Sequence, residues 1–238
     1  MNIKDSYNLV FFGDSITKGV VFDSEKYKYS TIKDSFTNIV ASSIKGTVYN
    51  AGKFGSTVIR GVSKMYNDVM KKTPDIVVIE FGGNDCDFKW EDIAQSPETE
   101  HQPNTDIGIF SETLLEMIDT LNEANIMPAL MTLPPLDPKR YFKWVTKGDP
   151  IAEKNVLRWL GSEEEIYYWH NYYNEMVVDV ANKTKTNLID VRSAFLNYPD
   201  YSQLLCTDGI HPNAKGHSVI AKVFLNYFQD NCNFILQK

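Results

Sequence analysis

Five short apolar segments recur along the chain, each followed by glycine, proline or polar residues. They lie at positions 9–12, 47–50, 75–81, 127–133 and 187–191. Apolar residues run through them almost without interruption instead of alternating with polar ones. This pattern is typical of strands that are buried on both faces of a parallel sheet. We therefore expect five parallel strands.

Between these segments, apolar residues recur at helical spacing. One stripe covers 114–121, after Ser111 as a candidate N-cap, a second covers 166–180, and a third covers 219–227 with Pro212 expected at the first helical position. Strands that alternate with helices predict an α/β sandwich around a parallel sheet. No internal repeat or linker interrupts the pattern, so we expect a single domain over residues 1–238.

Two segments are too long to be simple connections, and we interpret them as insertions near 86–106 and 136–149. The first contains six acidic residues and one lysine. The second contains four basic residues with three aromatic residues among them. Long loops in a compact domain often form lids or walls of a functional site, with a solvated surface excursion as the alternative.

Composition narrows the class of protein. The 238 residues carry 24 basic and 31 acidic side chains, so the net charge is 24 − 31 = −7, and an acidic chain without a basic run argues against a nucleic-acid partner. The three cysteines, Cys86, Cys206 and Cys232, have no zinc spacing. The N-terminus lacks an apolar leader, and no apolar run approaches the ~20 residues of a membrane span. We expect a cytoplasmic protein without a membrane span.

Small and polar residues follow the first three predicted strands. Gly13-Asp14-Ser15 follows the first strand, the 50–55 segment follows the second, and Gly82-Gly83-Asn84-Asp85 follows the third. A further polar segment, Asp208-Gly209-Ile210-His211, precedes the last helix. Because ligands of open parallel sheets bind beyond the carboxyl ends of the strands, we expect these segments to form one site.

The residue types in these segments suit acyl transfer. The hydroxyl of Ser15 becomes a good nucleophile only when a base removes its proton, which a neutral His211 can do near pH 7. Asp208, three residues earlier, can fix the tautomer of that imidazole. The N–H groups of Ser15 and Gly55 and the side chain of Asn84 can donate to the developing oxyanion. No phosphate-binding glycine motif occurs, so the mechanism needs neither a cofactor nor a metal.

The four segments resemble the sequence blocks of the SGNH (GDSL) hydrolases. These blocks are Gly-Asp-Ser, a glycine after the second strand, Gly-x-Asn-Asp and Asp-x-x-His, and here they span positions 13–211. The resemblance therefore covers nearly the whole chain. It implies a flavodoxin-like three-layer α/β/α sandwich with a five-stranded parallel sheet in the order 2-1-3-4-5.

The resemblance also assigns roles to residues. It makes Ser15 the nucleophile and an oxyanion donor, and Asp208 and His211 the other triad members. Asn84 becomes the side-chain oxyanion donor. Two glycines fall in the second block, of which we choose Gly55 and keep its neighbour at 52 as the alternative. The remaining histidines match no block, and we expect that of position 217 at the surface or half-buried.

We interpret the chain as a serine esterase that hydrolyses small O-acyl esters, acetyl or another short chain, through an acyl-enzyme. The expected partner is a small acyl ester, with an acylated carbohydrate as one candidate, because the acidic first insertion is unlike the apolar lid of an interfacial lipase. A lysophospholipase or thioesterase acting on longer chains is the alternative. A non-catalytic binding module on the same fold is the second alternative. The sequence does not indicate the oligomeric state.

Overall fold

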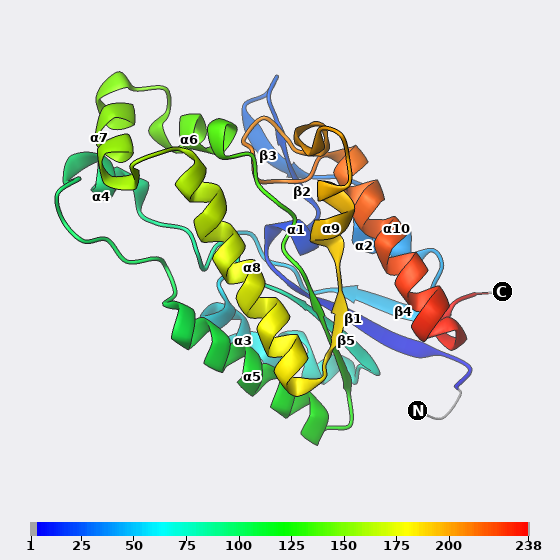
Figure 1. Cartoon of the computed structure of the whole chain (residues 1–238). Coiled ribbons are helices and arrows are strands. Elements are labelled where there is room, and N and C mark those ends of the chain that lie inside the picture. Colours follow the sequence, from blue (N-terminus) through cyan, green and yellow to red (C-terminus); the bar gives the residue numbers. More distant parts are fainter. Residues whose placement is uncertain (1–3, 238) are drawn as a thin grey trace.

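The computed structural model describes residues 4–237. Residues 1–3, on which part of the expectation about the N-terminus rests, and residue 238 lie outside this range. Five parallel strands form the central sheet in the order β4-β1-β5-β6-β7 (Figure 1). This order corresponds to the predicted 2-1-3-4-5 and confirms the fold class. The strands are β1 (Tyr7–Gly13), β4 (Gly46–Asn50), β5 (Ile76–Glu80), β6 (Met127–Met131) and β7 (Asn187–Ile189).

Helices cover both faces of the sheet, which explains why its strands are apolar throughout. In β1, Leu9 and Phe11 face one helical layer, whereas Val10 and Phe12 face the other, and all four are buried. The first layer consists of α2 (Phe36–Ala41), α9 (Val191–Leu196) and α10 (Ala214–Asn231). The second consists of α3 (Val58–Asp68), α5 (Ile107–Glu123) and α8 (Glu164–Thr184).

Both insertions contain helices that sequence analysis did not predict. They are α4 (Trp90–Gln95) and α6 (Pro138–Thr146), and α7 (Pro150–Leu160) follows them. The three pack around a small core of their own that includes Ile93 and Phe142. Figure 1 shows them gathered at one end of the molecule, away from both chain termini. A two-stranded hairpin, β2 (Val20–Asp23) and β3 (Lys28–Thr31), was also not predicted.

The predicted N-cap at Ser111 is wrong. Helix α5 begins five residues earlier, at Ile107, and Asp106 caps it by accepting hydrogen bonds from the N–H groups of Gly108 and Ile109. Ser111 lies inside the helix. Aspartate and serine are both good N-caps, so residue type alone did not distinguish Asp106 from Ser111. The apolar stripe over 114–121 starts beyond the first turn of the helix and did not mark where the helix begins.

The expected helical position of Pro212 is also wrong. Helix α10 begins at Ala214, and Asn213 is its N-cap. Pro212 instead pairs with Leu205 in an isolated β-bridge. His211 therefore lies outside the helix by more than one residue. Because the effect of the helix dipole falls off within the first turn, it has little influence on the imidazole.

No helix within residues 4–237 is both long and apolar enough to cross a membrane. The same residues contain all three cysteines, Cys86, Cys206 and Cys232, as buried free thiols. Burial raises the pKa of each thiol, so the thiolate forms that drive disulfide exchange and metal binding are disfavoured.

His217 is fully buried in α10, whereas the sequence indicated a surface or half-buried position. Its ring stacks on Phe36 with 5.9 Å between the ring centroids. Burial lowers the pKa of His217 to about 4, because the imidazolium form would lose its hydration. The histidine is therefore neutral in the folded protein at pH values where the unfolded chain already binds a proton.

We expect His217 to make the protein less stable in mild acid. Between its unfolded pKa of about 6.5 and its folded pKa of about 4, only the unfolded state is protonated, so stability present above pH 6.5 is lost as the pH falls. The loss amounts to about 2 kcal/mol between pH 8 and pH 5. Urea unfolding at both pH values should show a loss smaller by about this amount in His217→Gln. An equal loss in both proteins would contradict the assignment.

Candidate active site

Three of the residues singled out by sequence form one hydrogen-bonded chain. Ser15 begins the short helix α1 (Ser15–Lys18) directly after β1, and His211 lies in the loop before α10. The Nε2 atom of His211 is 2.9 Å from Ser15 Oγ, and its Nδ1 atom is 2.6 Å from Asp208 Oδ2. All three side chains are buried. The fold thus brings together groups that are 196 residues apart in sequence.

A carboxylate and two aromatic rings contact the imidazole of His211. Asp208 Oδ1 accepts hydrogen bonds from the N–H groups of Ile210 and His211, which fixes the carboxylate. The ring of Tyr29, from β3, lies 5.1 Å from the imidazole centroid, and the ring of Phe54 lies parallel to it at 6.1 Å. Sequence analysis missed both aromatic residues, because only the folded chain brings them to the histidine.

Two potential oxyanion donors lie beside the serine. Asn84 follows β5, and its Nδ2 donates one hydrogen bond to Asp14 Oδ2 at 2.8 Å, which leaves its second N–H for a ligand. The N–H of Gly55 faces no acceptor among residues 4–237, and Gly55 lines the cleft. The N–H of Gly52 instead donates to Asn50 Oδ1 at 2.9 Å. This difference favours Gly55 over Gly52 for the role expected from sequence.

A pair of buried acids lies beneath the serine. Glu80, the last residue of β5, accepts a hydrogen bond from Thr17 Oγ1 at 2.7 Å. Burial and the neighbouring Asp14 raise the pKa of Glu80 well above its usual range. Asp14 accepts from the Ile16 N–H and from Asn84, so we assign the charge to Asp14 and the proton to Glu80. In the sequence, Glu80 could have been recognised as the one acid in an otherwise apolar strand.

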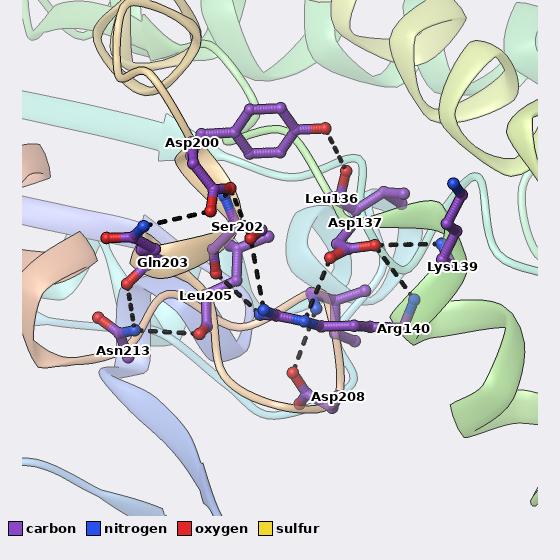
Figure 2. Close-up of polar contacts among 12 residues, drawn as sticks. Leu136, Asp137, Lys139, Arg140, Asp200, Ser202, Gln203, Leu205, Asp208 and Asn213 are labelled. Atoms are coloured by element: carbon purple, nitrogen blue, oxygen red, sulfur yellow. Dashed lines mark hydrogen bonds and ion pairs between the residues drawn. The ribbon is translucent and has the colours of Figure 1, made fainter.

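The second insertion supports the loop that carries the acid and the base. Asp137, the N-cap of α6, donates its N–H to the carbonyl of Gly209 at 2.8 Å. Arg140 donates to the carbonyl of Ser202 at 2.8 Å and pairs with Asp137 Oδ2 at 3.2 Å (Figure 2). Gly209 has φ +80°, and a Cβ there would lie within 3 Å of the α6 backbone. The insertion therefore packs directly against the 208–211 loop.

The serine and the histidine open into a cleft of about 920 Å³. Both insertions and the β2–β3 hairpin contribute to its walls, which carry many aromatic rings: Tyr29, Phe54, Trp90, Trp144, Trp159 and Trp169. Within residues 4–237, no three side chains of His, Cys, Asp or Glu are grouped as a metal site requires. The groups present in the cleft are those of nucleophilic acyl transfer.

The sequence and the fold are similar to those of known proteins. The profile of the GDSL-like lipase/acylhydrolase family matches residues 11–219. The uncharacterized lipoprotein YqeF of Bacillus subtilis (strain 168) is 25% identical over an alignment of 227 residues that covers 90% of this chain and 86% of the relative.

Solved structures with the same fold include two bacterial enzymes. A lipase/acylhydrolase from Enterococcus faecalis superposes with a TM-score of 0.69 at 21% identity, covering 97% of each chain. A catalytic mutant of an acetylxylan esterase from Geobacillus stearothermophilus superposes with a TM-score of 0.66 at 20% identity, covering 100% of each chain. At these identities, the likeness shows a shared fold.

Proposed function

The chain belongs to the GDSL-like lipase/acylhydrolase family and is an SGNH-type ester hydrolase, and on this basis we propose that it removes short acyl groups, such as acetyl, from an alcohol. The observation that carries the proposal is the hydrogen-bonded chain from Ser15 through His211 to Asp208 at the floor of the cleft. We assign these residues as nucleophile, general base and orienting acid.

In the proposed mechanism, Ser15 Oγ attacks the acyl carbonyl carbon while His211 Nε2 accepts the hydroxyl proton. Asp208 accepts a hydrogen bond from the Nδ1–H of His211 and stabilises the imidazolium that forms. Collapse of the tetrahedral intermediate expels the alcohol, which takes the proton from His211. A water molecule, deprotonated by His211, then hydrolyses the acyl-enzyme and restores the Ser15 hydroxyl.

The oxyanion of the intermediate needs donors that are already in place. We assign this role to the N–H groups of Ser15 and Gly55 and to the free N–H of Asn84 Nδ2. The hydrogen bond from Asn84 to Asp14 keeps the amide from rotating, so no reorganisation is needed during the reaction. Such fixed donors typically contribute about 2.7–4 kcal/mol each to transition-state stabilisation.

Two observations support a short acyl group. Members of the same fold include acetylxylan esterases. In addition, acidic and amide side chains from the first insertion line the cleft, and a long alkyl chain would remove their hydration without replacing their hydrogen bonds: Asp87, Glu91, Asp92, Glu100 and Gln102. An acylhydrolase for longer lipid or thioester chains is the alternative, and a non-catalytic binding module is the second alternative.

Hydrolysis of p-nitrophenyl esters from C2 to C12 tests the proposal. We expect kcat/KM to be highest at C2–C4, because the polar lining does not favour a long alkyl chain. A maximum at C8 or beyond would favour the lipid or thioester alternative. Absence of hydrolysis, together with no labelling of Ser15 by a fluorophosphonate, would favour the binding module.

Location, domain organisation and macromolecular partners stay predictions from the sequence. We keep the expectations of a cytoplasmic location, one domain over 1–238 and no nucleic-acid partner. The Bacillus subtilis relative is named as a lipoprotein, so fractionation of the native host is the appropriate test of location.

A further inference from the structure

A half-buried carboxyl group in the cleft wall has no part in the mechanism above. Asp87 lies three residues after Asn84 and lines the cleft. Its Oδ1 atom accepts hydrogen bonds from Trp90 Nε1 and from the hydroxyl of Tyr141, both at 2.7 Å. Trp90 begins α4 and Tyr141 belongs to α6, so one helix from each insertion orients this carboxyl group.

The carboxyl group of Asp87 has unused capacity to accept hydrogen bonds. Both side-chain donors reach Oδ1, and the backbone N–H of Phe88 also lies close to the carboxyl group. An ionised carboxylate offers about four acceptor positions, so a ligand can still donate to Oδ2. No lysine or arginine among residues 4–237 forms an ion pair with Asp87. The carboxyl group of Asp87 is therefore a fixed hydrogen-bond acceptor with capacity for one more donor.

Aromatic rings line the same cleft as this acceptor. The ring of Phe88 lies 5.0 Å from that of Trp159 and 5.6 Å from that of Trp169, measured between centroids. Phe88 and both tryptophans line the cleft and are half-buried. A directional acceptor beside flat apolar surfaces suits a ligand that carries hydroxyl groups on one edge and C–H groups on its faces.

The charge of the cleft argues against an anionic ligand. Lys147 and Lys89 are the lysines that line it, and Lys147 pairs with Glu91 at 2.7 Å. Further acidic residues line the same cleft: Asp92, Glu100 and Glu165. A phosphate or carboxylate on the substrate would meet mostly like charges. Hydroxyl groups both donate and accept, so they suit a wall that also carries Gln102 and His101.

We propose that Asp87, held by Trp90 and Tyr141, recognises the alcohol half of the substrate by accepting a hydrogen bond from a hydroxyl group of a neutral, polyhydroxylated leaving group. The inference rests on the proposed function, because a short acyl group leaves most of the cleft to the alcohol. Asp87 is thus a specificity-determining residue that discriminates between leaving groups.

The variant Asp87→Asn tests the inference. An asparagine keeps one oxygen for Trp90 and Tyr141 but places an NH₂ group where Oδ2 was, so a donor replaces the acceptor. The measurement is the ratio of kcat/KM for a mono-O-acetylated methyl pyranoside to kcat/KM for p-nitrophenyl acetate, which carries no free hydroxyl group. We expect this ratio to fall 10- to 100-fold in Asp87→Asn, mainly through KM for the glycoside.

Asp119→Asn is the matched control, because it removes the same charge from an exposed position on α5, which does not line the cleft. Its ratio should change less than threefold. An unchanged ratio in Asp87→Asn, or an equal fall in Asp119→Asn, would overturn the inference. A higher kcat/KM for acetylcholine than for the glycoside, lost in Asp87→Asn, would overturn it in favour of a cationic alcohol. Wild-type enzyme active on p-nitrophenyl acetate but not on the glycoside overturns this inference alone, whereas inactivity on both overturns the proposed function.

Discussion

Ser15→Ala is expected to lower kcat for p-nitrophenyl acetate by about 10⁶-fold, the size of effect seen when the nucleophile of a comparable serine site is removed. The substitution deletes only Oγ, the atom 2.9 Å from His211 Nε2. Without Oγ, no acyl-enzyme can form. Substrate still binds, because His211 keeps its hydrogen bond to Asp208 and the backbone N–H of residue 15 remains. The variant should also fail to react with a fluorophosphonate.

Steady-state kinetics and mass spectrometry of the labelled protein measure both effects. Ser218→Ala, at an exposed position in α10, is a matched control that should keep full activity and labelling. A Ser15→Ala variant that retains more than a tenth of wild-type activity would show that another group is the nucleophile.

Asp208→Asn is expected to lower kcat by about 10⁴-fold while the fold is retained. In the native site, Oδ1 accepts from the N–H groups of Ile210 and His211, and Oδ2 accepts from His211 Nδ1. The single oxygen of an asparagine satisfies the two backbone donors, so its NH₂ group must face Nδ1. The imidazole then carries its proton on Nε2 and cannot accept the proton of Ser15.

The substitution Asp208→Asn should lower kcat without a comparable change in KM. Substrate contacts are unchanged, so KM should stay within a few-fold of the wild-type value, and thermal unfolding should be similar. Asp200→Asn provides the control, because Asp200 caps the short 201–204 helical turn at the surface and touches none of the reacting groups. A fall in kcat of less than tenfold for Asp208→Asn would remove Asp208 from the orienting role.

The sequence was sufficient to predict the sheet and the side chains that gather at its carboxyl edge. Continuous apolar runs marked the parallel strands, and parallel strands end at one edge. Ser15 and Asn84, which follow two of these strands, were therefore expected to lie close together at that edge of the sheet. The Asp208 and His211 pair could be recognised because a three-residue spacing allows the contact within one loop.

The walls of the site could not be predicted from local pattern. Asp87 and Tyr141 are 54 residues apart and meet only because α4 and α6 pack together. The helices of the insertions are short and bury their apolar residues against one another, so neither composition nor periodicity distinguished them from loops. The ring of Tyr29 reaches His211 through a hairpin whose register depends on tertiary contacts. These features come from packing at long sequence separation.

The long separation between Ser15 and His211 has a consequence for biosynthesis. At translation rates of about 5–20 residues per second, the serine leaves the peptidyl-transferase centre roughly 10–40 s before the 196-residue interval to the histidine is complete. In the proposed mechanism, a nascent chain therefore carries a serine without its base and cannot cleave esters until the 208–211 loop has docked. Ester hydrolysis would thus report docking of this loop, and a chain that ends before the loop is inert toward the esters around it.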